Sequence, residues 1–223
     1  MYVKPVMQDV TVKQGAMKGE KWSNNTHPLP IWELHDLPVP DISLFNKRTD
    51  ILLDGQERFV KDLNDPHRYV CVPNEETLLE FNKQHSIFAQ SISQCLHEIQ
   101  KKNKDTYTIA ELPRKIDLSI LANNIDNISK GIKYIGDQAG CGMGWHLDNR
   151  LATGAMIINL QDNVDSTEFA LSDEADEALY RGPTKRGTGI FWFNTYATFH
   201  RIIVTAYRCI SFMNIGVLSV YAP

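Results

Sequence analysis

Short apolar segments separated by turn residues fill residues 131–216, and this pattern restricts the possible folds most strongly. No long helical stretch lies between the segments, so the pattern disfavours a parallel α/β sheet and favours a β-sandwich or β-barrel. A short capped helix is expected within this set, over residues 172–180. Seven strands are predicted, over residues 131–135, 143–148, 155–160, 168–171, 189–193, 199–206 and 208–215.

The first 130 residues follow different patterns. Seven of the ten prolines lie between residues 5 and 73, which favours short strands and wrapping loops over long regular elements. Apolar residues then recur at three- and four-residue steps over 75–103, which predicts one helix with Asn74 as its N-cap. A second helix is predicted over about 114–127.

Composition excludes several classes of protein. The 223 residues carry 23 Lys+Arg and 27 Asp+Glu, a net charge of −4, which disfavours a nucleic-acid binder and a polybasic membrane binder. The longest apolar stretch, at the C-terminus, is interrupted by polar residues and is too broken for a membrane span.

Cysteines and the N-terminal sequence indicate the compartment. The four cysteines, at 71, 95, 141 and 209, form no Cys-x-x-Cys pair, which argues against a zinc ribbon and a thioredoxin-type motif. Residues 1–15 lack the apolar region of a signal peptide. A reducing, cytoplasmic location is therefore expected.

The pattern His146-x-Asp148 lies in a predicted strand and is a candidate metal site. Residues i and i+2 of a strand point to the same face, so the two side chains can converge on one ion. His200, which opens a later strand, is the natural second imidazole. Two histidines and one carboxylate on one face of an octahedral ion form the facial triad of non-haem Fe(II) oxygenases. His-x-Asp alone is a weak signal, and its wider context matters more.

That context resembles a known family. Lys133-Tyr134-Ile135-Gly136 with Gly144-Trp145-His146-Leu147-Asp148, and Gly189-Ile190-Phe191-Trp192-Phe193 with Thr198-Phe199-His200-Arg201-Ile202, resemble the signature of the 2-oxoglutarate/Fe(II)-dependent oxygenase superfamily. The prolyl-hydroxylase-like branch is the nearest. The resemblance covers residues 131–216 and implies a double-stranded β-helix, also called a jelly-roll, of the cupin-like kind.

The resemblance also implies roles for individual residues. His146, Asp148 and His200 match the metal ligands, Arg208 matches the residue that anchors the far carboxylate of 2-oxoglutarate, and Tyr134 matches a tyrosine that reaches the same carboxylate. Arg208 follows His200 by eight residues, slightly earlier than in many members, and Ile210 replaces a frequent serine, so Arg201 remains a weaker rival. A carboxylate at Asp148 favours hydroxylation or desaturation over halogenation.

Two further features allow alternative interpretations. Seven acids and no basic residue lie in residues 151–180. They are either a solvated loop or, with Glu168 first, a region that attracts a cationic substrate. Trp145 and Trp192 flank the ligand motifs, and each is either a core residue or part of a wall facing the substrate.

These observations together predict a single domain over 1–223 that is mainly β with packing helices. Residues 1–130 are expected to support the sheet, and residues 131–216 to form the catalytic jelly-roll core. The expected function is hydroxylation of an aliphatic C–H bond of a small or amino-acid-like substrate, using Fe(II), O2 and 2-oxoglutarate. The alternatives are a peptidyl (prolyl-type) hydroxylase and a non-catalytic jelly-roll binding module.

Overall fold

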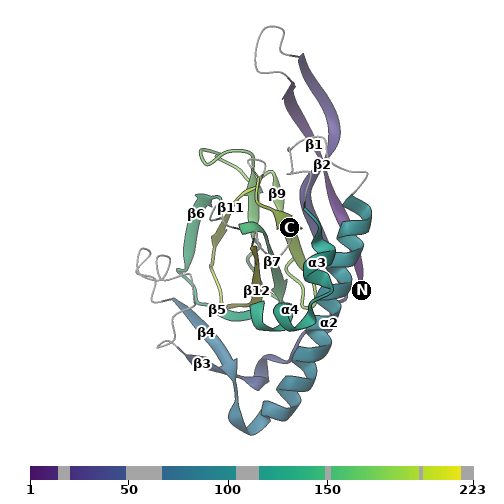
Figure 1. The fold of residues 1–223 in the computed structure, drawn as a ribbon. Helices are drawn as coiled ribbons and strands as arrows, with labels where there is room; N and C mark the ends of the chain where they lie inside the picture. Colours follow the sequence, from purple (N-terminus) through teal and green to yellow (C-terminus); the bar gives the residue numbers. More distant parts are fainter. Residues whose placement is uncertain (15–20, 49–66, 104–115, 149–151, 196–197, 217–223) are drawn as a thin grey trace.

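The computed structural model describes residues 1–14, 21–48, 67–103, 116–148, 152–195 and 198–216, and strands dominate it (Figure 1). Its first four strands are β1 (Tyr2–Gln14), β2 (Lys21–His35), β3 (Phe45–Arg48) and β4 (Arg68–Pro73). The others are β5 (Lys133–Asp137), β6 (Gly142–His146), β7 (Ala152–Asn159), β8 (Glu168–Ala170), β9 (Tyr180–Arg181), β10 (Gly189–Phe193), β11 (Phe199–Ile203) and β12 (Arg208–Gly216).

The strands form two sheets whose connections are those of a jelly-roll. The larger sheet has the order β1-β2-β10-β7-β12-β5-β4-β3, and the smaller sheet has the order β6-β11-β8-β9. From β5 onward the chain alternates between the two sheets, except that β8 and β9 both belong to the smaller one. The pairs with a described register are all antiparallel. The predicted double-stranded β-helix is therefore confirmed, and each of the seven predicted strands has a counterpart.

The N-terminal strands extend the larger sheet at both ends, and the expectation of only short strands there is wrong. β1 has 13 residues and β2 has 15. Pro5 lies in the edge strand β1, where the ladder shifts register between Pro5 and Met7, and Pro28 pairs with Met7 at the same irregularity. Prolines are tolerated at edges and bulges because no ladder hydrogen bond is lost there.

The helix predicted over 75–103 is confirmed. A 3-10 turn η2 (Glu75–Thr77) leads into α2 (Leu78–Asn103), and the Asn74 side chain accepts from the Glu76 amide, which caps the start. Within the described part of the chain, no helix is both long and apolar enough to cross a membrane.

The helix predicted over about 114–127 is two short helices, α3 (Leu118–Ala122) and α4 (Ile125–Gly131). Asn124 interrupts the run because its side chain caps α4 by accepting from the Asn127 amide. Residues 114–115 lie outside the described residues. Local capping therefore divides an apolar run that the sequence suggested was continuous.

The prediction of a helix over residues 172–180 is wrong. Ser172 accepts from the Glu174 amide, but the segment continues as turns and bends until β9. Its backbone pairs elsewhere, because the Leu179 amide donates to Phe169 and the Ala175 carbonyl accepts from the Trp145 indole.

Each face of the larger sheet packs against a different layer. One face joins the apolar side of α2, α3 and α4 in the main core, and the other faces the smaller sheet. Alternation along a strand decides the face, so Tyr134 and Met213 pack toward the helices while Ile135 and Ile210 pack between the sheets. In Figure 1 the helices line one side of the sheets, and the space between the sheets lies away from them.

Candidate metal centre

His146 and His200 face each other across one strand pair. His146 ends β6, His200 is the second residue of β11, and the two are direct partners in the ladder. Their ring centroids lie 4.2 Å apart. Partners in a ladder point to the same face, so this pairing brings together two imidazoles that are 54 residues apart in sequence.

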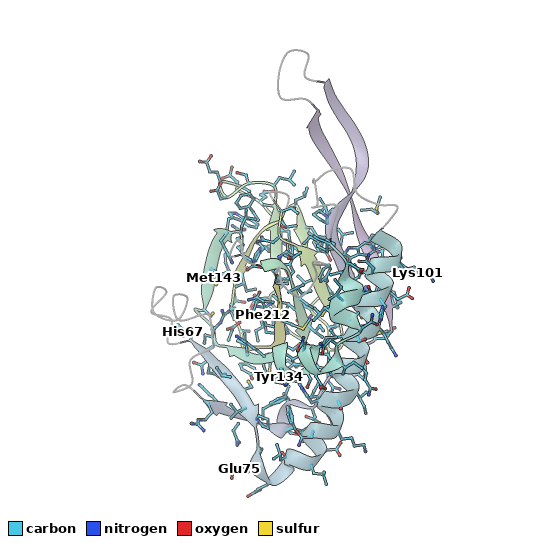
Figure 2. The ribbon with its side chains drawn as sticks, viewed as in Figure 1. His67, Glu75, Lys101, Tyr134, Met143 and Phe212 are labelled. Carbon is cyan, nitrogen blue, oxygen red and sulfur yellow. The ribbon has the colours of Figure 1, made fainter. Side chains whose placement is uncertain are left out.

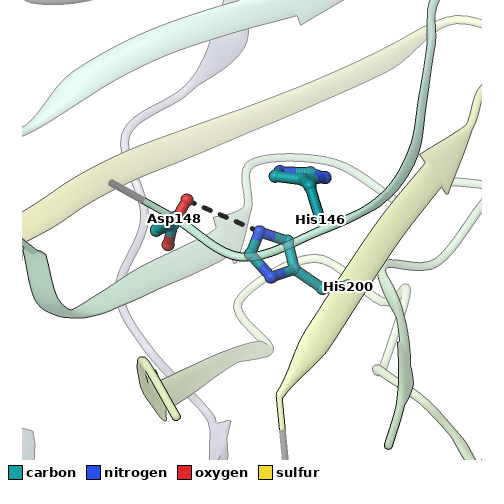
Figure 3. Close-up of side chains that lie close together, drawn as sticks. All are labelled: His146, Asp148 and His200. Carbon is teal, nitrogen blue, oxygen red and sulfur yellow. Dashed lines mark ion pairs between the residues drawn. The ribbon is translucent and has the colours of Figure 1, made fainter. Parts of the chain in front are cut away.

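Asp148 completes a cluster of three ligand side chains (Figure 3). One ligand atom from each of His146, Asp148 and His200 lies within 4.8 Å of the others. Oδ1 of Asp148 lies 3.5 Å from Nε2 of His200. The strand predicted over 143–148 is too long, since β6 ends at His146 and Asp148 lies beyond it. The side-chain amide of Asn194 donates to the Asp148 carbonyl (3.0 Å) and fixes this segment.

Backbone carbonyls orient both imidazoles in the same way. Nδ1 of His146 lies 2.8 Å from the Gly144 oxygen, and Nδ1 of His200 lies 3.1 Å from the Thr198 oxygen. A carbonyl only accepts, so each Nδ1 carries the proton and each Nε2 presents a lone pair. Hydrogen bonds of this kind orient metal-binding histidines in proteins.

The environment of the cluster favours a cation. Burial, with the nearby His200, lowers the pKa of His146, so this ring is neutral and able to bind a metal at neutral pH. Oδ2 of Asp148 is buried and has no hydrogen-bond partner among the described residues. An unpartnered buried carboxylate oxygen is costly, and a metal ion would satisfy it. Two imidazoles and one carboxylate with further positions open suit Fe(II).

Thr198 fixes the turn that precedes His200. The Thr198 side chain is buried, and its hydroxyl lies within donating distance of two carbonyl oxygens, that of Phe193 (2.8 Å) and that of Thr195 (2.9 Å). The same hydroxyl accepts a hydrogen bond from the Thr195 amide. Its own carbonyl is the group that orients His200. The β6–β11 ladder also shifts register between His200 and Ile202. Such irregularities are common beside functional sites, because they redirect single side chains.

The two tryptophans lie in different surroundings. Trp192 is fully buried between the sheets, and its ring centroid lies 4.9 Å from that of His200 and 5.4 Å from that of Phe169. Its indole nitrogen has no hydrogen-bond partner among the described residues. The Trp145 ring instead packs against Arg201, whose guanidinium carbon lies 4.2 Å from the centroid of the Trp145 ring. Trp192 is therefore the tryptophan that contacts the triad.

Arg208 lies in a buried polar cluster between the sheets. Its Nη2 donates to the Thr167 hydroxyl (2.8 Å), and its Nη1 lies 3.6 Å from Oδ2 of Asp137. Asp137 also accepts two hydrogen bonds from Arg68, at 2.7 and 3.2 Å. Arg208 alternates with Cys209 along β12, so it shares the inner face with Ile210. The triad occupies this same space between the sheets.

Tyr134 lies on the opposite face of the larger sheet. Its hydroxyl is 2.6 Å from Nδ1 of His85 on α2, and its ring packs against Phe45 and Phe81. In Figure 2 Tyr134 lies beside the helices, whereas Phe212 packs between the two sheets. The structure therefore does not bring Tyr134 to the triad.

Arg201 and Glu168 pair with each other. Oε2 of Glu168 lies 2.7 Å from Nε of Arg201, and Oε1 lies 2.7 Å from Nε of Arg181. Burial raises the pKa of Glu168, but the bonds to the two arginines outweigh it and hold the pKa below its ordinary value. Phe169 and His200 point between the sheets, so their neighbours Glu168 and Arg201 point outward.

Comparison with known proteins gives matches among solved structures. No protein-family model matches the chain, and no curated protein is similar to it in sequence. An oxidoreductase of the 2OG-Fe(II) oxygenase family from Burkholderia pseudomallei aligns with 45% of the length of this chain and 56% of its own length, with 13% sequence identity and a TM-score of 0.31. A prolyl-4-hydroxylase from Pseudomonas putida matches 59% of this chain and 87% of its own, with 8% identity and a TM-score of 0.31.

Four residues of the site were missed by the sequence analysis: Arg68, Asp137, Asn194 and Thr198. The sequence did contain a signal for Asp137. It follows Ile135 by two residues, so the two side chains share the apolar face of the strand, and a carboxylate on such a face requires a buried partner. Asn194 and Thr198 act through backbone carbonyls, which no residue pattern reveals.

Proposed function

We propose that this chain is an Fe(II)- and 2-oxoglutarate-dependent dioxygenase that hydroxylates an aliphatic C–H bond of a small or amino-acid-like substrate. The observation that supports this most is the convergence of His146, Asp148 and His200, with both Nδ1 atoms held by carbonyls and Oδ2 of Asp148 buried without a partner. This donor set binds one face of an octahedral ion and leaves the other face for ligands.

The side chains of this site have distinct roles in the proposal. Bound iron supplies the activation of O2, coupled to conversion of 2-oxoglutarate to succinate and CO2. The Nε2 atoms and the carboxylate hold the metal, and the carbonyls of Gly144 and Thr198 keep the imidazoles in the required tautomer. Trp192 and Phe169 pack against His200 and exclude water from that side. Arg208 receives the far carboxylate of 2-oxoglutarate, because a guanidinium binds a carboxylate with two hydrogen bonds.

The net charge and the cysteines support a class of substrate and a cellular location for the proposed enzyme. A net charge of −4 supports a small metabolite over a nucleic acid as substrate. All four cysteines lie in described segments, are buried and form no disulfide, which supports a reducing, cytoplasmic location.

Anaerobic titration tests the proposal. Adding Fe(II) and 2-oxoglutarate to the protein is expected to give the weak visible charge-transfer band of the metal chelate. His200→Ala removes one ligand and is expected to abolish the band. His97→Ala, on the exposed side of α2, is the matched control and should keep it. Absence of a band with folded wild-type protein would contradict the proposal and leave a non-catalytic binding module.

Substrate class needs a second experiment. Succinate release above the uncoupled rate, measured across amino acids, short peptides and nucleosides, identifies the class that couples to turnover. We expect an amino acid or a similar small molecule to give the largest increase. Coupling only with proline-containing peptides would favour the peptidyl hydroxylase instead.

A further inference from the structure

The face of β6 that carries His146 is open to solvent beside this ligand. Gly144 precedes His146 by two residues, so both direct their side-chain positions between the sheets. Gly144 is exposed, and a Cβ added there would meet nothing within 4 Å. The side of the triad at His200 is closed, because Trp192 and Phe169, which pack against this ring, are almost completely buried. A molecule from solvent can therefore reach the ligands past Gly144.

Exposure increases along the inner face of β12, an inner strand of the larger sheet. The side chains that β12 directs between the sheets are, in order, those of Arg208, Ile210, Phe212 and Asn214. Arg208 and Ile210 are buried, whereas Phe212 is half-buried and Asn214 is exposed. An inward-facing residue of an inner strand is exposed only where the other sheet does not cover it. The space between the sheets is therefore open at the Asn214 end of β12.

This open end lies near the triad but far from Arg208. Asn214 and Trp192 are both ladder partners of Ala155, one on each side of β7, so their strands lie roughly 10 Å apart in one row across the sheet. Asn214 follows Arg208 by six residues, which is roughly 20 Å along a strand. A five-carbon acid held between Arg208 and the metal does not extend to Asn214. The open end is therefore left for a different molecule.

The side chains around Phe212 favour an uncharged, apolar ligand. Ile157 is the ladder partner of Phe212 on β7, and it too is half-buried although it faces the other sheet. On the other side of Phe212, β5 places Lys133 in the ladder, so a cationic ligand would meet a like charge. Glu168, the first acid considered for attracting a cation, points outward. A carboxylate would lose its water against Phe212 and Ile157, whereas an aliphatic group would bury apolar surface there.

We propose that Phe212 and Asn214 form the substrate-binding surface, and that the substrate is an amino acid with an uncharged aliphatic side chain, which approaches the metal past Gly144. The proposal rests on the proposed function, because it names the substrate class of the same site. Phe212 packs against the aliphatic side chain. The Asn214 amide, which both donates and accepts hydrogen bonds, binds the polar end of the amino acid near solvent.

Binding of L-leucine, L-lysine and L-glutamate tests the substrate class. Each is titrated anaerobically into the protein loaded with Fe(II) and 2-oxoglutarate, and isothermal titration calorimetry gives its dissociation constant. L-Leucine is expected to bind at least about tenfold more tightly than the other two, because only its side chain packs on Phe212 without burying a charge. Succinate release above the uncoupled rate should be largest with L-leucine.

Two variants test the residues of the surface. Phe212→Ala removes the apolar contact and is expected to weaken L-leucine binding about 5- to 30-fold. Asn214→Ala removes the hydrogen bonds to the polar end and is expected to weaken it about 3- to 30-fold. Asn46→Ala, at an exposed asparagine of β3 in the same sheet, is the matched control and should bind L-leucine as the wild type does.

Substitutions at Gly144 test the path of approach. The φ of Gly144 is not positive and the space around its Cβ position is empty, so both Gly144→Ala and Gly144→Leu are expected to fold. The leucine side chain fills the open space, and L-leucine binding should weaken at least about tenfold in Gly144→Leu and less in Gly144→Ala. The dissociation constant of 2-oxoglutarate, from the charge-transfer band, should stay within about twofold in each variant, because Arg208 and the triad are unchanged.

Each outcome has a defined meaning. Selective weakening of L-leucine binding supports the proposal. Tighter binding of L-lysine or L-glutamate, no binding of L-leucine, or unchanged L-leucine binding in both Asn214→Ala and Gly144→Leu overturns it. Equal weakening of L-leucine and 2-oxoglutarate also overturns it, since this indicates damage to the metal site. If Phe212→Ala does not fold, as judged by circular dichroism, the two variants at the exposed positions decide the test. Absence of the charge-transfer band in the wild type overturns the proposed function itself, whereas a normal band without L-leucine binding overturns this proposal alone.

Discussion

His146 and His200 are direct partners in the β6–β11 ladder, with their ring centroids 4.2 Å apart. Strand pairing therefore fixes the distance between the two imidazoles, and no flexible loop is needed to bring them together. Asp148 lies two residues past the end of β6 and depends on Asn194 for its position. The triad thus combines two ligands set by the sheet with one set by a side-chain contact.

Thr198→Val tests the support of His200. Valine keeps the shape but loses the hydroxyl that bonds Phe193 and Thr195. We expect metal affinity to fall about 10- to 100-fold, and the free energy of unfolding to fall by about 1–3 kcal/mol. Mn(II) titration and denaturant unfolding measure the two effects. Thr205→Val removes a hydroxyl bond to Asp165 outside the triad, and should leave metal affinity unchanged. Full metal affinity in Thr198→Val would contradict the assigned role.

His85→Gln tests a buried histidine in the helix layer. Burial lowers the pKa of His85 below its ordinary value of 6.5, although the bond to Ser129 opposes this. The unfolded chain therefore takes up a proton at higher pH than the folded protein, so stability is lost as pH falls below about 6.5. We expect the wild type to lose more unfolding free energy between pH 7.5 and about 5.5 than the glutamine variant. Parallel losses in denaturant titrations would show that His85 is not responsible.

Gly189→Ala tests a close approach of two strands. An added Cβ would overlap the carbonyl oxygen of Ile157 and lie 2.9 Å from the Cα of Ile158 on β7. Because backbone must move, we expect a loss of about 1–3 kcal/mol in unfolding free energy. At Gly144 an added Cβ meets nothing within 4 Å, so Gly144→Ala is the control and should change stability little. Equal stability of the two variants, measured by thermal unfolding, would contradict the expected clash.

Asn74→Ala removes the cap at the start of η2 and α2. The Asn74 side chain accepts from the Glu76 amide at 3.2 Å. We expect a loss of about 0.5–2 kcal/mol, measured by denaturant unfolding. Asn82→Ala makes the same change at an exposed position within α2, where no cap is lost, and should be neutral or slightly stabilising. A loss as large in Asn82→Ala would argue against a specific capping effect.

The β-core and the long helix were predictable because their patterns are local. Strands between turn residues, and apolar residues at helical steps with Asn74 before them, specify their elements within a few residues. The triad was predictable for the same reason, since His146 and Asp148 are close in sequence and His200 lies near the start of a recognisable strand.

Other features depend on contacts that sequence does not encode locally. β1 and β2 are long because an edge and a register shift accommodate their prolines. The sequence does not show which residues of β5 point between the two sheets. Tyr134 and Ile135 are both buried and apolar, and a shift of one residue would exchange the two faces of the strand. That exchange is why Tyr134 contacts His85 and not the triad. The pairing of Arg68 with Asp137 spans 69 residues and required the sheet order to be known.

The pairing of β2 with β10, in which Trp32 lies opposite Phe191, has a consequence for any shortened form of this protein. β10 is an inner strand in the described sheet, and all five of its residues are buried. A chain cut to residues 131–216 would turn β10 into an apolar edge, with its backbone open to other molecules and Trp192 near the new margin. Such edges lead to aggregation. The N-terminal hairpin therefore protects the edge of the half that carries His146, Asp148 and His200, and we expect the two halves to be stable only when they are produced as one chain.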